Sequence, residues 1–173
     1  MPMLLMSTPH ADPEPLSVQC AVITVSDTRG QTTDKSGQLM RSRLTESGHA
    51  ITHYQIVKDQ PEQIAALVTS LASRSDVQAV LLNGGTGIAA RDTTFDAIAP
   101  LLDKELPGFG ELFRHLSYAE IGSRAIASRA IAGIHHQTLI FSVPGSTKAV
   151  SLALEKLILP ELQHLTRLLQ PGS

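Results

Sequence analysis

The sequence is poor in the residues that disulfide-linked and nucleic-acid-binding proteins use most. It has a single cysteine, Cys20, which excludes an intramolecular disulfide, and it has no tryptophan. Aromatic residues make up 3% of the chain, and the formal net charge is −2. A general nucleic-acid binder would carry a basic face or an aromatic stacking platform, so we expect no nucleic-acid partner.

Long hydrophobic runs are also missing. No apolar stretch approaches the roughly 18 residues that span a bilayer, and the apolar start Met1–Met6 is too short for a secretion signal. We therefore expect a cytoplasmic protein without a membrane partner. The 173 residues suffice for one domain with a substantial core. Four prolines within residues 1–17 predict a flexible N-terminal tail, and residues 18–173 are expected to form a single domain.

The first half of the chain alternates strand and helix patterns. Cys20 is expected to act as a buried hydrophobe at the start of a β-branched apolar run, typical of a parallel strand covered on both faces. A helix capped by Asp34 or Ser36 is expected to stop at Gly48, and a helix start is expected at 59–62. Short connections between these elements predict a parallel sheet. The expected strands cover residues 20–26, 51–57 and 77–82.

The second half is less regular. Thr93–Asp96 resembles a capping box that opens a helix to about Leu102, and residues 109–116 carry a helical apolar spacing. Residues 138–143 predict a strand. A last long helix is expected from Thr147, kinked or split by Pro160. Residues 123–134 show no clear pattern.

The glycine-rich loop after the third expected strand is the leading candidate for a ligand site. Gly84, Gly85 and Gly87 leave main-chain N–H groups accessible, so an anion could approach them closely. In open α/β sheets, ligands bind outside the carboxyl ends of the strands, where the loops after Val25 and Val143 should also lie. The loop matches neither the P-loop nor the dinucleotide motif. Spacing alone leaves open a simple tight turn.

Two carboxylates follow the second and third expected strands. Asp59 and Asp92 would suit Mg²⁺, which prefers oxygen ligands and contacts substrate phosphates. Each could instead cap or favour the helix that follows it. Four cations could neutralise an anionic substrate, although solvated surface charge is the default for each: Arg91, Arg124, Arg129 and Lys148.

The seven histidines are expected to form no metal site. His135 and His136 are adjacent, so in a strand they would point to opposite faces. No paired-cysteine pattern and no Ser–His–Asp or Cys–His arrangement favours zinc or nucleophilic chemistry.

Several motifs in order resemble the MoaB/MogA family of molybdenum cofactor biosynthesis, which also occurs as a domain of gephyrin. They cover about residues 20–165. The resemblance implies a three-layer α/β/α fold with a mostly parallel central sheet. The motifs are Thr24–Asp27, Asp34–Gly37, Asn83–Gly87 with Arg91-Asp92, Glu105–Phe109, Ser128–Ala130 and Pro144–Ser146.

The same resemblance implies binding of molybdopterin and its adenylylation from ATP with Mg²⁺. Asp59 and Asp92 match the acidic positions that support the metal and catalysis. The other matching positions are implied to line the substrate pocket. These are Ser26, Asp27, Gly84, Gly85, Thr86, Gly87, Glu105, Pro107, Gly108, Ser128, Pro144, Gly145 and Ser146.

Two departures bear on the subfamily. Residues 88–90 lack the proline that often precedes the arginine, and the last turn ends in Ser146 where many members have asparagine. The second departure, together with Phe113–Ser117 and Glu120–Gly122, resembles bacterial MoaB more than MogA. This resemblance implies a hexamer built of trimers, with a trimer as the alternative. The functional alternative is an oligomer that binds molybdopterin or its precursor without catalysis.

Overall fold

The computed structural model describes residues 14–172. Most of the predicted N-terminal tail, residues 1–13, lies outside this range. Within it, residues 14–17 have no regular secondary structure, and the Leu16 N–H donates to Gln163 Oε1 at 2.9 Å. The described part of this segment therefore lies along the last helix.

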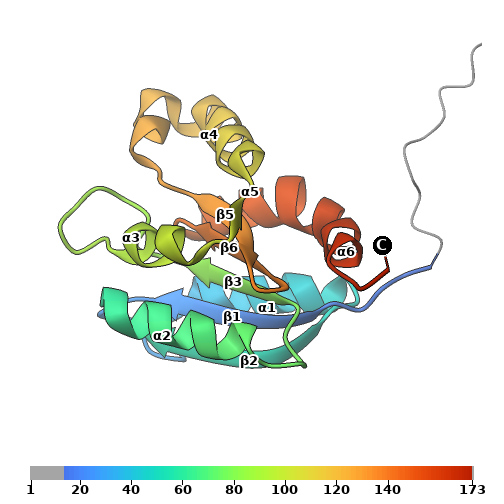
Figure 1. The fold of residues 1–173 in the computed structure, drawn as a ribbon. Helices are drawn as coiled ribbons and strands as arrows, with labels where there is room; N and C mark the ends of the chain where they lie inside the picture. Colours follow the sequence, from blue (N-terminus) through green and yellow to red (C-terminus); the bar gives the residue numbers. More distant parts are fainter. Residues whose placement is uncertain (1–13, 173) are drawn as a thin grey trace, which may run out of the picture.

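Six strands form one sheet in the order β2-β1-β3-β6-β5-β4 (Figure 1). The four strands β2, β1, β3 and β6 are parallel to one another, and β5 and β4 form an antiparallel edge. All three strands expected in the first half are confirmed, as is the strand at 138–143. The strands are β1 (Gln19–Val25), β2 (Ala50–Val57), β3 (Ala79–Asn83), β4 (Lys104–Glu105), β5 (Ile131–His135) and β6 (Thr138–Val143).

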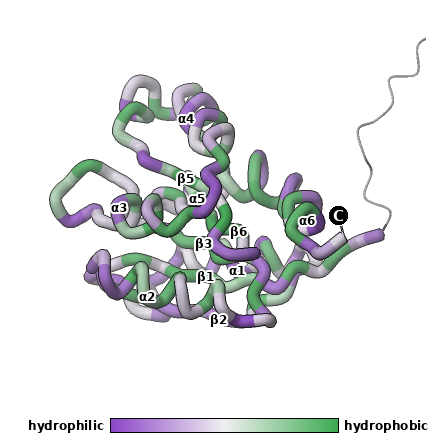
Figure 2. The backbone as a smooth tube through the Cα atoms, viewed as in Figure 1, coloured by the Kyte–Doolittle hydropathy of each residue, from purple (hydrophilic) through white to green (hydrophobic). Residues whose placement is uncertain are grey.

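Helices cover both faces of the sheet. One apolar cluster joins the sheet to α1, α4, α5 and α6, and a second joins its other face to α2 and α3. Figure 2 shows hydrophobic stretches along the central strands, between these layers. This confirms the three-layer α/β/α prediction. The helices are α1 (Lys35–Glu46), α2 (Pro61–Ala72), α3 (Thr94–Ile98), α4 (Pro107–Ile121), α5 (Thr147–Ala153) and α6 (Leu159–Leu168).

The predicted ends of α1 are confirmed. The Asp34 carboxylate accepts from the Gly37 N–H at 2.9 Å at the start of the helix, and Gly48 follows its end with φ +87°. A left-handed residue after a helix favours glycine, which has no Cβ to clash. Cys20 is completely buried, and burial raises the pKa of its thiol to about 12. It acts as a core hydrophobe, as expected.

The structure corrects one expectation for the second half, assigns the unpatterned residues 123–134, and confirms that the last helix is split near Pro160. The Thr93 side chain does not cap α3, because its hydroxyl donates to Asp59, so the capping box does not form. Residues 123–134 contain a 3₁₀ segment (Gly122–Ala127) and β5. The last helix is interrupted by a π-helical turn (Leu154–Ile158) just before Pro160, where proline removes a backbone donor.

The expected orientation of the two adjacent histidines is also wrong. His136 has φ +56° and lies in the β5–β6 turn, outside the strand. The strand rule of opposite faces therefore does not apply to it. The two imidazole rings lie together, with centroids 4.2 Å apart.

In the range 14–172, no helix has both the length and the apolar character needed to cross a membrane.

Candidate functional site

A cavity of about 310 Å³ lies at the carboxyl ends of the parallel strands. Three segments that follow β1, β2 and β3 meet there, together with the turn after β6, as expected for a ligand site of an open α/β sheet. The lining residues are Val25, Ser26, Asp27, Thr28, Arg29, Asp59, Gly84, Gly85, Arg91, Asp92 and Gly145.

The floor of this cavity is a left-handed glycine turn. Gly84 has φ +107° and Gly85 has φ +64°. A Cβ on Gly84 would lie 2.2 Å from the Val25 carbonyl oxygen, and one on Gly85 would lie 2.1 Å from Thr94 Oγ1. Only glycine fits both positions. The Gly85 N–H has no hydrogen-bond partner among the described residues, so it remains available to an anion.

Asp59 and Asp92 both line the cavity, and each keeps one carboxylate oxygen free of hydrogen bonds to described residues. Asp59 Oδ1 accepts from the Thr93 N–H (3.0 Å) and Oγ1–H (2.6 Å), which leaves Oδ2. Asp92 Oδ2 accepts from the Ala89 N–H at 3.2 Å, which leaves Oδ1. Asp59 therefore joins two loops and does not cap α2, whose first turn has no side-chain cap.

The loop after β1 is organised around its own polar side chains. Ser26 Oγ accepts from the N–H groups of Thr28 (3.3 Å) and Arg29 (3.0 Å). Asp27 Oδ1 accepts from the Asp59 N–H at 3.1 Å, so the β1 and β2 loops are linked directly. These contacts hold the predicted residues Ser26 and Asp27 beside the predicted Asp59.

Arg29 is a site residue that the sequence analysis missed. Its guanidinium donates to the Gly145 carbonyl at 3.1 Å and lies 3.9 Å from the Asp34 carboxylate. With Arg91 it brings positive charge to a cavity that also holds the carboxylates of Asp27, Asp59 and Asp92. Its place four residues past the end of β1, in a loop predicted to face the crevice, was the available signal.

Arg129 holds the glycine loop from outside the cavity. Its guanidinium donates to the Gly87 carbonyl (2.8 and 3.0 Å) and the Asp92 carbonyl (3.0 Å), and it pairs with Asp96 at 2.9 Å. Its own N–H donates to the Thr86 carbonyl at 2.9 Å. The default of solvated surface charge is therefore wrong for this arginine, which positions the loop that carries Asp92.

The other predicted pocket residues lie outside this cavity. Thr86 and Gly87 are on the Arg129 side of the loop. Pro107 and Gly108 line a separate, more apolar cavity of about 420 Å³, and Ser146 caps α5 by accepting from the Ala149 N–H. Their substrate roles stay predictions, as do those of Glu105 (in β4), Ser128 and Pro144 (adjoining Gly145).

Comparison with known proteins decides the family. Residues 21–164 match the domain described as "Probable molybdopterin binding domain". The chain belongs to this molybdopterin-binding family. The molybdenum cofactor biosynthesis protein B of Bacillus subtilis is 57% identical over 159 residues, covering 91% of this chain and 94% of that protein. The Halalkalibacterium halodurans protein of the same name is 55% identical, with the same coverage.

Solved structures of the family agree. A crystal structure of molybdenum cofactor biosynthesis protein B has a TM-score of 0.88 at 54% identity, covering 90% of this chain and 98% of that one. The tungsten cofactor synthesizing protein MoaB from Pyrococcus furiosus has a TM-score of 0.81 at 38% identity, covering 89% and 98%. A MogA structure is 25% identical. The chain is thus closer to MoaB than to MogA, as the sequence motifs predicted.

Proposed function

We propose that this protein binds molybdopterin and transfers AMP to it from ATP in the presence of Mg²⁺. The family supports molybdopterin as the ligand. The observation that carries the catalytic part is the pair of carboxylates, Asp59 and Asp92, each with a free oxygen beside the glycine turn. In this reaction a phosphate oxygen of the pterin forms a bond to the α-phosphorus of ATP, and the α–β anhydride bond breaks to release pyrophosphate.

The donor set fits a hard cation. Asp59 Oδ2 and Asp92 Oδ1 would hold Mg²⁺, which when bound neutralises charge on the reacting phosphates. The remaining work is positioning, in which protein groups align two anionic reactants. Arg29 and Arg91 would bind phosphate oxygens, and the Gly85 N–H would donate to an oxygen at the floor of the cavity.

The test is incubation of the purified protein with molybdopterin and Mg-ATP, with chromatography of the adenylylated pterin and an assay for pyrophosphate. Because Asp92→Asn removes a charge from the proposed metal site, we expect kcat to fall at least about 100-fold. Asp59→Asn keeps an acceptor for Thr93 and should lower kcat to a similar extent. Asp76→Asn, a change at an exposed aspartate paired with Arg74, is the control and should leave turnover unchanged.

A second function in the same pathway is binding without turnover. It is favoured by Ser146, which stands where many family members have asparagine. Stoichiometric pterin binding with no adenylylated product would establish this binder and refute the transferase. Wild-type turnover in Asp92→Asn would instead remove the role assigned to that carboxylate.

A further inference from the structure

The β5–β6 turn gathers three side chains that can bind a metal. His135 ends β5, and His136 is the first residue of the turn. The planes of their two imidazole rings are tilted by 32° to each other, and the ring centroids lie 4.2 Å apart. Asp103 precedes β4 and reaches the same turn. One ligand atom from each of these three residues lies within 4.8 Å of the other two.

The backbone holds Asp103 in place. Its N–H donates to the Ile134 carbonyl at 2.8 Å, and its Oδ2 accepts from the His136 N–H at 2.6 Å. The backbone of Asp103 is therefore hydrogen-bonded to β5, and its carboxylate is hydrogen-bonded to the β5–β6 turn. Oδ2 also lies 3.9 Å from His135 Nδ1, which is too far for a hydrogen bond.

His135 supplies an independent observation. The residue is only 8% exposed, and both of its ring nitrogens are buried without a hydrogen-bond partner among the described residues. A buried polar atom without a hydrogen-bond partner lowers the stability of the folded protein. A bound ligand or ion could satisfy such an atom. A metal bound to Nδ1 would meet this need at one nitrogen.

We propose that Asp103, His135 and His136 bind a divalent transition-metal ion, with Zn²⁺ as the representative case. Two imidazoles and one carboxylate suit Zn²⁺, Co²⁺, Ni²⁺ or Cu²⁺, whereas Mg²⁺ prefers oxygen ligands alone. Three protein ligands leave one tetrahedral position for water.

Only a small movement of the three side chains is needed to bring their ligand atoms to coordination distance. Ligand bonds of about 2.0–2.2 Å place two ligands of a tetrahedral Zn²⁺ roughly 3.4 Å apart. The His135–Asp103 separation of 3.9 Å is already close to this value. Asp103 and His136 are exposed, so torsions of their side chains can shorten the remaining separations, all of which lie within 4.8 Å.

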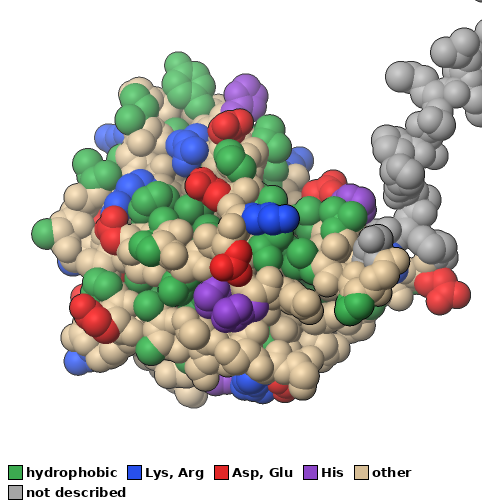
Figure 3. All heavy atoms as spheres, in the orientation of Figure 1, with side chains coloured by type: hydrophobic (Ala, Val, Ile, Leu, Met, Phe, Trp, Pro, Cys, Tyr) green, Lys and Arg blue, Asp and Glu red, His purple; other side chains and the backbone are tan. Residues whose placement is uncertain are grey.

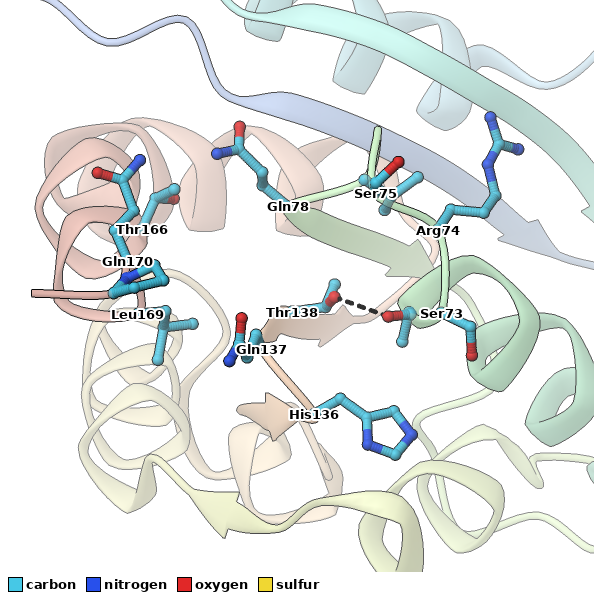
Figure 4. Close-up of a pocket in the computed structure, with 13 residues that line it drawn as sticks. Ser73, Arg74, Ser75, Gln78, His136, Gln137, Thr138, Thr166, Leu169 and Gln170 are labelled. Atoms are coloured by element: carbon cyan, nitrogen blue, oxygen red, sulfur yellow. Dashed lines mark hydrogen bonds between the residues drawn. The ribbon is translucent and has the colours of Figure 1, made fainter.

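This site is separate from the carboxylate pair of the glycine loop. Because β5 runs antiparallel to β6, His135 lies at the end of the sheet opposite the carboxyl ends of the parallel strands. Figure 3 shows histidine side chains beside an acidic one on the visible face. Figure 4 shows His136, Gln137 and Thr138 between Ser73 and Leu169, and these residues help to line a cavity of about 470 Å³.

A bound metal would join the segment before β4 to the β5–β6 turn. It would thereby tie down the antiparallel edge of the sheet, whose outermost strand β4 has only two residues. We expect a stabilising ion here, with an open coordination position facing solvent.

The experiment titrates the untagged, EDTA-treated, full-length protein with ZnCl₂ in a calorimeter and with CoCl₂ in a visible spectrometer, in excess MgCl₂. His136→Gly removes one ligand and keeps the left-handed turn, because glycine adopts positive φ. Asp103→Asn removes the charge and keeps an acceptor for the His136 N–H. His115→Ala, at an exposed histidine on α4, is the matched control.

We expect about one metal per chain, and tetrahedral-type Co²⁺ absorption. Loss of a residue that only hydrogen-bonds a metal ligand already weakens metal affinity roughly 10–100-fold. Because each variant changes a ligand itself, it should bind the metal at least about tenfold more weakly than wild type. Zn²⁺ at about a hundredfold excess over the wild-type Kd should raise the Tm of wild type and His115→Ala by about 5 °C or more, and that of His136→Gly and Asp103→Asn by about half as much or less. Absence of binding, or equal binding in His136→Gly, Asp103→Asn and wild type, would overturn the proposal whatever the outcome of the adenylylation assay.

Discussion

A buried carboxylate, Asp34, connects the first strand to the first helix. It accepts from Thr24 Oγ1 and the Tyr54 hydroxyl, each at 2.6 Å, and from the Gly37 N–H. The residue is completely buried, so these donors replace the water that the carboxylate loses. Arg29, whose guanidinium also reaches Gly145, lies 3.9 Å away. Through Asp34 and Arg29, these polar contacts connect the start of α1 to the cavity.

Tyr54 makes this network sensitive to alkaline pH. Burial and the hydrogen bond to the Asp34 carboxylate raise its pKa from 10.0 to about 12. Because the folded pKa is raised, this stabilisation is complete below pH 10 and is lost as the pH rises through about 12. At pH 11 the extra loss of unfolding free energy should be about 1 kcal/mol. Urea denaturation at pH 8 and pH 11 should show this loss in wild type and not in Tyr54→Phe.

Tyr118→Phe is the control for this change. Tyr118 is 64% exposed on α4 and makes no contact with Asp34 among the described hydrogen bonds, so its variant should keep the wild-type pH dependence. An equal alkaline loss in Tyr54→Phe and wild type would contradict the assignment.

Among the elements, the turn after β3 has the strictest conformational demands. Gly84 and Gly85 are both left-handed, and Thr94 at the start of α3 donates its N–H to the Gly85 carbonyl at 3.1 Å. Asp59, Thr94 and Val25 leave no room for a Cβ at this turn. Strand, turn and helix are therefore packed as one unit around the cavity, and Arg129 holds the rest of the loop.

Gly85→Ala should disrupt this unit. The left-handed conformation alone costs a residue with a Cβ about 1–2 kcal/mol, and the contact with Thr94 adds to this, so we expect a loss of about 2 kcal/mol or more. Pterin binding should weaken in parallel. Gly30→Ala is the control, because a Cβ at Gly30 meets nothing within 4 Å; its unfolding free energy should change little. Equal stability of Gly85→Ala and wild type would show that the turn can relax.

For the whole molecule, the exposed apolar side chains of α4 bear on the predicted self-association. Three large hydrophobic residues of this helix are more than half exposed: Leu112 (53%), Tyr118 (64%) and Ile121 (52%). Ile126, in the adjoining 3₁₀ segment, is 84% exposed. Tyr118 and Ile121, three residues apart, are neighbours on the helix surface, and exposed apolar side chains that lie together favour a protein interface.

The family resemblance implies the stoichiometry, and we predict a hexamer built of trimers, with the trimer as the smaller alternative. Light scattering coupled to gel filtration should give a mass six times, or three times, that of one chain. Ile121→Glu places a charge on the apolar surface of α4, so it should shift the mass to a smaller species. Glu120→Gln, a neighbouring change that adds no charge, should not. A monomeric wild-type protein would exclude this assembly.

Local patterns were sufficient for most of the fold. The apolar runs of β1, β3 and β6 and the caps of α1 depend on neighbouring residues, and their predictions are confirmed. The capping box at Thr93 failed because a more distant acceptor, Asp59, binds its hydroxyl. Arg29 and Arg129 were missed or misjudged for the same reason, since their partners are far away in the chain.

The sequence by itself determined the alternation of strands and helices, the glycine turn and the family, because each depends on residue order or local backbone preference. Only the tertiary structure decided which of the predicted residues share a cavity, since that depends on how the loops pack. It brought Asp59 and Asp92 to one cavity and left Pro107 and Gly108 in another. It also placed His135 and His136 beside Asp103, because a left-handed turn overrides the strand rule.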